Sequence, residues 1–147
     1  MIELKRILLV EDSPNDAELT LEALAEINLA NEINWLKDGE EALDYLYLRG
    51  AYSGREPVNP ILILLDLKLP KVDGRQVLQE IRNDPRLRTI PVVVMTSSRE
   101  ESDLASCYAN GVNAYVVKPI NFAEFMEAVK ALGIFWAAIN EPPPAQI

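Results

Sequence analysis

The sequence predicts an α/β fold in which helices cover both faces of one parallel sheet. The first observation is that short apolar segments alternate with helical patterns five times along the 147 residues. The second is that the segments at residues 7–10, 61–65 and 114–117 are continuously apolar. Strands with this pattern are buried on both faces, as parallel strands between two helix layers are. Because crossovers between parallel strands are right-handed, the pattern favours a doubly wound sheet.

Turn and capping residues delimit the elements of the first half. Ser13 is suited to cap a helix, Pro14 to be its first residue, and residues 17–27 continue with helix formers. A turn at residues 37–39 separates the second strand from the second helix. We expect strands at residues 7–10, 32–36 and 61–66, helices at residues 14–27, 40–48 and 75–83, and a long loop at residues 49–60.

Proline and glycine mark the boundaries of the second half. Pro85 ends the third helix, Pro91 opens the fourth strand, and the pair Asn110-Gly111 ends the fourth helix. We expect strands at residues 92–95 and 112–117 and helices at residues 99–109 and 121–139. The length is that of a single domain, expected over residues 1–140, and the proline run at 142–144 predicts a disordered tail over residues 141–147.

Composition excludes several classes of partner. The formal net charge is −9, from 23 acidic and 14 basic residues, so DNA and anionic membranes would repel the chain. No apolar run reaches the roughly 20 residues that a membrane-spanning helix needs. The single cysteine, Cys107, cannot form an internal disulfide, and no signal segment precedes residue 7. We therefore expect a cytoplasmic protein that binds neither nucleic acid nor membrane.

The sequence contains no histidine. This absence excludes Ser-His-Asp and Cys-His catalysis, most catalytic zinc sites and a phosphohistidine carrier. The chemistry that remains uses carboxylates, lysine, hydroxyl groups and hard metal ions.

Acidic side chains follow two of the buried strands. Glu11 and Asp12 come after the first strand, and Asp66 ends the third. If these strands are neighbours, the three carboxylates converge at the switch point of the sheet, where such folds hold their ligands. A cluster of this kind raises a carboxyl pKa or binds a cation, and an all-oxygen site suits Mg²⁺.

The ends of the other two strands add complementary groups. Lys118 supplies a positive charge, Thr96 a hydroxyl donor, and Ser97 a small side chain that leaves its backbone N–H accessible. Each residue alone is more often a cap or a turn residue, but the four strand ends together have the parts needed to place a phosphoryl group on Asp66.

These residues resemble the receiver domain of two-component response regulators. The resemblance covers residues 5–133 and is carried by LVEDS at 9–13, LDLKLP at 65–70, DG at 73–74, MTS at 95–97 and YVVKP at 115–119. It implies the flavodoxin-like receiver fold with strand order 2-1-3-4-5. It also implies a signalling domain that is not an enzyme, apart from slow loss of its own phosphoryl group.

The resemblance assigns roles to the acidic residues. Asp66 would accept a phosphoryl group from a histidine kinase. Asp12, Asp66 and the backbone carbonyl of Lys68 would bind Mg²⁺, and Glu11 would act through a water on the metal.

The resemblance also assigns a switch. Thr96 and Lys118 would contact the phosphoryl group, Ser97 and Ser98 would belong to its surroundings, and Lys68 and Ser98 would flank it. Tyr115 would move between exposed and buried positions as Thr96 moves, which shifts the population of two arrangements of the domain. The output face would be the fourth helix, fifth strand and fifth helix. The bond before Pro119 resembles one that is cis in the family.

The last helix carries apolar residues beyond those that one face against the sheet requires. Phe135, Trp136 and Ile139 are the additional ones. They either fold back on the domain or form a partner surface, and we expect a symmetric homodimer through the last helix and fifth strand. The chain would then be a stand-alone receiver that acts on a downstream protein.

The chain is similar in several segments to the small receivers partnered with cyanobacterial phytochromes. These segments are the extension of the last helix, the loop at residues 49–60 with Asn59-Pro60, and the sequence of residues 61–69. Receivers of other hybrid or bacteriophytochrome-type kinases are the close alternative. Two other functions stay open. One is a haloacid dehalogenase-like aspartyl phosphatase, which would require a second carboxylate two residues after the nucleophile, at the position of Lys68. The other is a scaffold of receiver fold that is never phosphorylated.

Overall fold

The structure, a computed structural model, describes residues 5–30 and 32–144. Its sheet has five parallel strands in the order β2-β1-β3-β4-β5. The strands are β1 (Arg6–Val10), β2 (Glu32–Leu36), β3 (Leu62–Leu65), β4 (Val92–Thr96) and β5 (Ala114–Val117). The predicted fold class and strand order are confirmed, although β5 begins at Ala114, two residues later than predicted.

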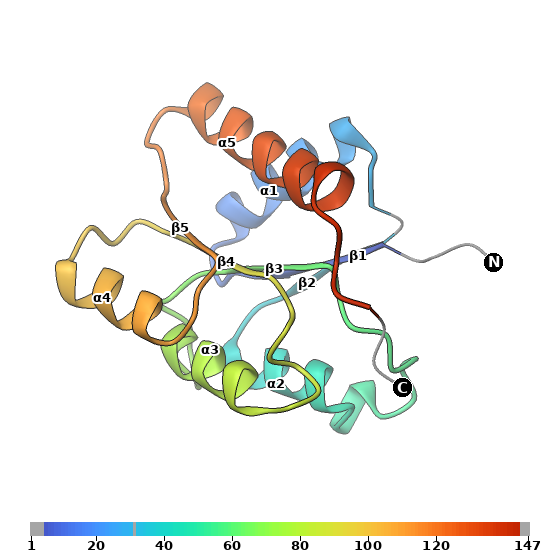
Figure 1. The fold of residues 1–147 in the computed structure, drawn as a ribbon. Helices are drawn as coiled ribbons and strands as arrows, with labels where there is room; N and C mark the ends of the chain where they lie inside the picture. The colour runs from blue at the N-terminus through green and yellow to red at the C-terminus, as the bar shows by residue number, and fades with distance from the viewer. Residues whose placement is uncertain (1–4, 31, 145–147) are drawn as a thin grey trace.

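The helices form one layer on each face of the sheet (Figure 1). One layer contains α1 (Pro14–Ile27) and α5 (Phe122–Ile134), and the other contains α2 (Gly39–Tyr47), α3 (Gly74–Asn83) and α4 (Glu101–Ala109). Of the described helices, none combines the length and the apolar character needed to cross a bilayer.

Continuous apolar sequence in the central strands arises from burial on both faces. In β1, Leu8 and Val10 face the α2–α4 layer, whereas Ile7 and Leu9 face the α1–α5 layer. Every residue of β1, β3 and β4 is buried, while β5 at the edge is only half-buried. The absence of polar alternation therefore correctly indicated parallel strands between two helix layers.

Side-chain caps set the start of most helices. Ser13 Oγ accepts the backbone N–H of Asp16 at 3.4 Å, and Pro14 is the first residue of α1, as the sequence predicts. Asp38, Asp73 and Asn121 cap α2, α3 and α5 in the same way. α4 begins two residues later than predicted, because Glu100 is extended and its N–H is donated to Ser98 Oγ.

Gly74 brings the start of α3 against the end of β3. Its backbone N–H is donated to the carbonyl of Leu67 at 2.8 Å, and a Cβ atom at this position would lie 2.1 Å from the carbonyl oxygen of Asp66. Only glycine permits this approach, so Gly74 helps to position Asp66.

The long loop at residues 49–60 packs on α2 and contains a short 3₁₀ helix, η1 (Gly50–Tyr52). The Arg55 guanidinium lies 3.9 Å from the ring centre of Tyr45 and donates to the backbone carbonyl oxygen of Tyr45 at 2.8 Å. Tyr52 donates to Glu41 at 2.9 Å, and burial together with this bond raises the pKa of Tyr52 to about 12. The loop is thus an ordered part of the domain.

The last helix changes character at its end. α5 is followed by a π-helical turn, η2 (Phe135–Ile139), in which Trp136 is half-buried against the α1–α5 core and Ala137 is buried. Lys5 Nζ donates to the carbonyl of Ala137 at 2.7 Å. Phe135 and Ile139 are 44% and 64% exposed. The extension therefore folds back through Trp136 and leaves the other two predicted residues on the surface.

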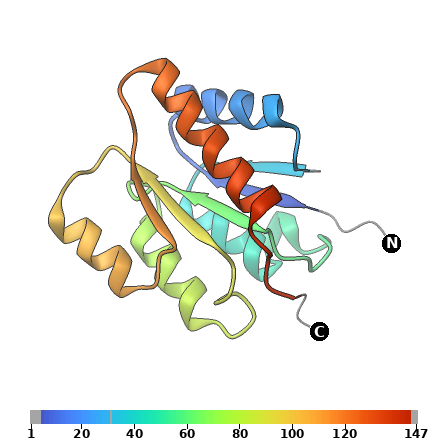
Figure 2. The ribbon, with the colours of Figure 1, turned by 45° about the horizontal axis from the view of Figure 1, so that its top comes forward.

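The segment after η2 leaves the α1–α5 layer and descends toward the α2 layer (Figure 2). Residues 141–144 form no helix or strand. The rest of the predicted disordered tail, residues 145–147, lies outside the described residues.

Candidate functional site

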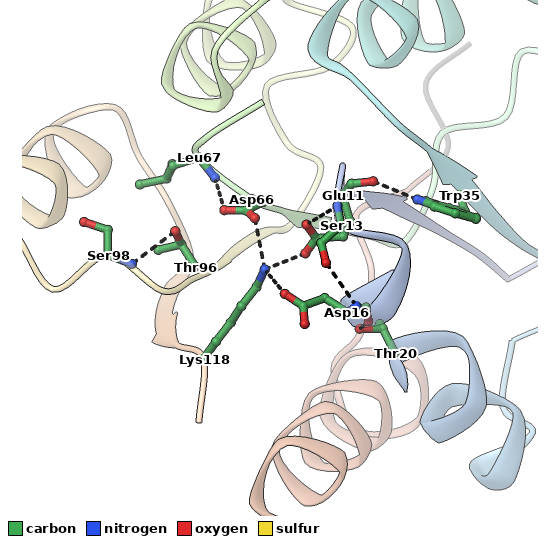
Figure 3. A network of polar contacts seen from close by, with 10 residues as sticks. All are labelled: Glu11, Ser13, Asp16, Thr20, Trp35, Asp66, Leu67, Thr96, Ser98 and Lys118. Carbon is green, nitrogen blue, oxygen red and sulfur yellow. Dashed lines mark hydrogen bonds and ion pairs between the residues drawn. The ribbon is translucent and has the colours of Figure 1, made fainter. Parts of the chain in front are cut away.

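The carboxyl ends of β1, β3, β4 and β5 meet at one edge of the sheet (Figure 3). Glu11, Asp12 and Asp66 each offer a carboxylate oxygen, and these atoms lie within 4.8 Å of one another. Lys118 reaches the same point from the segment after β5. The structure thus brings together the acidic residues and the lysine that the sequence placed at a common edge.

Lys118 is the cation at the centre of the site. Its Nζ donates to Glu11 Oε1 at 2.6 Å, to Asp16 Oδ2 at 2.8 Å and to Asp66 Oδ2 at 3.0 Å. Burial alone would lower the pKa of Lys118, but the bonds to Asp16 and Glu11 and the negative charge of Asp66 raise it above its ordinary value. Lys118 therefore stays protonated throughout the neutral range.

Glu11 is the most buried of these acids, with 3% of its surface exposed. Burial raises the pKa of Glu11 to about 7; the hydrogen bond from Lys118 opposes this rise, and the charge of Asp66 adds to it. Its second oxygen, Oε2, accepts the backbone N–H of Ser13 at 3.1 Å, which holds the turn between β1 and α1.

Asp66 is buried but accessible, with 8% of its surface exposed. Its Oδ1 accepts the backbone N–H of Leu67 at 2.7 Å, and its Oδ2 accepts Lys118. These two bonds fix the carboxylate in one orientation. Asp12, in contrast, is exposed, and its carboxylate has no hydrogen-bond partner among the described residues.

The donor set fits a hard divalent cation. Three carboxylates, those of Glu11, Asp16 and Asp66, accept hydrogen bonds from Lys118, and a carboxylate oxygen of Asp12 lies within 4.8 Å of those of Glu11 and Asp66. The carboxylates of this cluster outnumber the lysine, so the site carries excess negative charge. The carbonyl of Lys68 accepts no backbone hydrogen bond within the described chain and is free to be a ligand. Carboxylate and carbonyl oxygens around an open position are the surroundings that Mg²⁺ prefers.

The loop after β4 is organised by hydroxyl groups. Thr96 is buried, and its Oγ1 accepts the backbone N–H of Ser98 at 3.4 Å, while Ser97 is exposed. The backbone N–H of Lys118 is donated to the carbonyl of Thr96 at 2.8 Å, which joins this loop to the one after β5. All described peptide bonds are trans, including that between Lys118 and Pro119, whose state the sequence left open and whose counterpart in the family is cis.

The hydroxyl of Ser98 points away from Asp66 (Figure 3). It donates instead to Asp103 Oδ2 at 2.6 Å, and Asp103 also accepts Arg75 Nη1 of α3 at 3.1 Å. The Tyr115 hydroxyl donates to the Ser98 carbonyl at 3.1 Å, and its ring packs half-buried on the α2–α4 core. Ser98 is thus held by Thr96 and Tyr115 through its backbone and by Asp103 through its side chain.

Sequence reasoning missed four residues of this region. Asp16 was detectable, because an acid in the first turn of a helix that follows a strand faces the switch point. Asp103 and Arg75 gave no signal, since both are ordinary helix-surface residues by sequence. Trp35, whose indole N–H is donated to the Glu11 carbonyl at 2.8 Å, reads only as an apolar residue of β2.

Comparisons with known proteins find a family model and several relatives that match most of this chain. The chain matches the response regulator receiver domain family over residues 7–130. Response regulator Rcp1 of Synechocystis sp. is 43% identical over 141 residues, which are 96% of this chain and 95% of Rcp1. A solved structure of Rcp1 is of its Mn²⁺-bound form.

Two further solved structures are similar over nearly the whole chain. The phosphorylated cyanobacterial phytochrome response regulator RcpA has a TM-score of 0.91 and 42% identity, and the match covers 97% of this chain and all of RcpA. The bacteriophytochrome response regulator RtBRR has a TM-score of 0.77 and 58% identity, with 97% and 86% of the two chains covered. Fold similarity is therefore greater to RcpA, and sequence similarity to RtBRR.

Proposed function

This chain belongs to the response regulator receiver domain family, and we propose that it carries a two-component signal by accepting a phosphoryl group on Asp66. The observation that supports this proposal is the setting of the Asp66 carboxylate. It is held by Leu67 N–H and Lys118, accessible at the sheet edge, and adjacent to Glu11 and Asp12. Such rigid positioning beside countercharges is what in-line phosphoryl transfer requires.

In the proposed transfer, an oxygen of Asp66 forms a bond to phosphorus as the bond from phosphorus to the donor histidine nitrogen breaks. Lys118 lies beside the carboxylate and neutralises the negative charge that arrives with the phosphoryl group. Mg²⁺, held by Asp12, Asp66 and the Lys68 carbonyl with Glu11 acting through a water, would add further charge neutralisation.

The signal would pass through the loop after β4. A Thr96 hydroxyl that turns to the phosphoryl oxygens would loosen the Ser98 N–H bond it now accepts, and Ser98 in turn holds Tyr115. The proposed switch is a shift between two arrangements of these residues, read by a protein partner at the face formed by α4, β5 and α5.

We propose a phytochrome-type histidine kinase as the phosphoryl donor. The similarity to Rcp1, RcpA and RtBRR, each over nearly the whole of this chain, supports this choice. The higher identity to RtBRR favours a bacteriophytochrome-type kinase over a cyanobacterial one. The downstream partner would be a protein, and the site of action the cytoplasm.

We also propose a symmetric homodimer through the end of the last helix. Ile134, Phe135 and Ile139 are 40%, 44% and 64% exposed and lie within six residues of one another. Trp136 is half-buried in its own domain. It therefore supports the exposed residues from beneath and contributes little to the contact area itself. Exposed aromatic and aliphatic side chains of this kind are typical of interface cores.

Mass spectrometry after incubation with acetyl phosphate and Mg²⁺ tests the central proposal. The wild-type protein gains the mass of one phosphoryl group, and neither the Asp66→Asn variant nor wild type in EDTA does. Release of phosphate from small phosphoesters at steady state would favour the phosphatase. A chain that never gains mass, with either small donors or a phosphorylated kinase, would be a scaffold.

A further inference from the structure

Asp12 differs from the other carboxylates of the site in how it is held. Glu11, Asp16 and Asp66 all accept hydrogen bonds from Lys118, whereas the Asp12 carboxylate is exposed and has no partner among the described residues. Its position therefore depends on the backbone that carries it.

That backbone is fixed by β2. The N–H of Glu11 is donated to the carbonyl of Leu36 at 3.0 Å, as the last ladder bond between β1 and β2. β2 ends at Leu36 and the chain turns into α2, so the ladder supplies no donor for the next carbonyl, that of Glu11. The side chain of Trp35 takes this place, and its indole N–H is donated to Glu11 O at 2.8 Å (Figure 3).

Trp35 is itself firmly placed. Its ring packs half-buried on the α1–α5 core, and the Lys37 ammonium lies 5.3 Å from its ring centre. The carbonyl that it holds belongs to the peptide unit that joins Glu11 to Asp12. Because a peptide unit is planar, fixing its oxygen restricts the direction in which the Asp12 Cα and side chain leave the strand.

We propose that Trp35 is a positioning residue that orients Asp12 for a divalent cation. This inference rests on the proposed function, since it concerns the metal site of the phosphoryl acceptor. Removal of the indole N–H frees the Glu11–Asp12 peptide unit, and ordering it again on metal binding then lowers the affinity.

The test is a Mn²⁺ titration monitored by electron paramagnetic resonance, which measures the concentration of free Mn²⁺. Trp35→Phe keeps an aromatic ring but loses the donor, and we expect its affinity to fall roughly three- to tenfold, the range for one lost hydrogen bond. The matched control is Trp136→Phe, which alters the other tryptophan, in η2 after α5, and leaves the affinity unchanged. Circular dichroism melting of each variant verifies that it is folded.

A double-mutant cycle with Asp12→Asn separates positioning from general damage to the fold. If Trp35 acts through Asp12, Trp35→Phe lowers the residual affinity of the Asp12→Asn protein much less than that of wild type. Equal losses in both backgrounds would overturn the inference.

Fluorescence gives a second readout that does not depend on altering Trp35. In the Trp136→Phe protein Trp35 is the remaining tryptophan, and its emission changes on addition of Mg²⁺ in the wild-type Asp12 background but not with Asp12→Asn. If Trp35→Phe binds Mn²⁺ with wild-type affinity, or if Trp35 emission does not change at saturating Mg²⁺, the positioning role of Trp35 is overturned and the proposed function still stands. A wild-type protein that binds no Mn²⁺ overturns the proposed function as well.

Discussion

At the scale of single residues, the site depends on how one lysine balances several carboxylates. Lys118 is shared by three carboxylates, to which its Nζ donates at 2.6 to 3.0 Å. A buried cation so paired offsets repulsion that would otherwise protonate the acids or open the site.

Replacement of Lys118 by alanine leaves Glu11 and Asp66 buried without a countercharge. We expect the free energy of unfolding in EDTA to fall by about 3 kcal/mol, the cost of breaking a buried ion pair, and Mg²⁺ to restore part of it. Urea unfolding measures both effects. The control is Lys71→Ala, which removes the ion pair between an exposed lysine and Asp38 at 3.6 Å and changes stability by about 0.5 kcal/mol or less. Equal effects of the two variants would contradict this account.

The raised pKa of Glu11 predicts a dependence of stability on pH. The carboxyl has a pKa of about 7 in the folded protein and 4.5 as its ordinary value, so the folded state binds the proton more tightly. Stability in metal-free buffer therefore falls as pH rises from about 4.5 to about 7. The Glu11→Gln variant lacks this contribution, and its unfolding free energy varies less across the same window. A wild type and variant with parallel pH profiles would show that Glu11 has an ordinary pKa.

At the scale of elements, close backbone contacts place the strand ends. The approach of α3 to β3 at Gly74 determines where the Asp66 backbone lies. Hydrogen bonds of Ser98 join the loop after β4 to α4 and β5, and Asp103 of α4 extends this network to Arg75 of α3. These contacts connect the acceptor region to the proposed output face through rigid elements.

Gly74→Ala would place a methyl group 2.1 Å from the Asp66 carbonyl oxygen. Because both sides of this contact are backbone, we expect a loss of stability of about 3 kcal/mol or more and slower phosphorylation of the folded fraction. Gly54→Ala is the matched control, since a Cβ atom there meets nothing within 4 Å. Chemical unfolding and phosphorylation rates check the pair. A Gly74→Ala protein as stable as Gly54→Ala would refute the close approach.

At the scale of the whole molecule, the proposed homodimer depends on η2, the turn that follows α5. η2 is anchored by Trp136 and by the Lys5 bond to Ala137, yet it leaves Phe135 and Ile139 on the surface. An anchored element with exposed apolar side chains is a preorganised surface, so its occupation by a second copy costs little ordering.

The double substitution Phe135→Ser, Ile139→Ser removes the exposed apolar side chains of η2 and keeps Trp136, at the cost of the edge-on contact between the Phe135 and Trp136 rings, whose centres lie 5.0 Å apart. We expect wild type to sediment as a dimer at tens of micromolar and the variant as a folded monomer of slightly lower thermal stability. Val58→Ser, which alters an apolar residue 38% exposed on the long loop, leaves the dimer intact. Wild type that sediments as a monomer, phosphorylated or not, would refute the proposed dimer.

Local sequence determined the strands, the caps and the residues at the strand ends. Continuous apolar runs, Ser13 with Pro14, and Asp66 at the end of its strand are all encoded by neighbours in the chain, and their structural environment matches the prediction. The parallel arrangement then follows, because short strands that alternate with helices have few other ways to bury both faces.

Only the tertiary structure decided the contacts between residues far apart in sequence. The bonds of Trp35 to Glu11, of Ser98 to Asp103, and of Lys118 to Asp16 depend on how strands and helices are placed in space. The division of the last turn into a buried Trp136 and an exposed Phe135 depends on the π-helical turn. A linear pattern records what each residue can bond with, whereas packing selects which partner lies within reach.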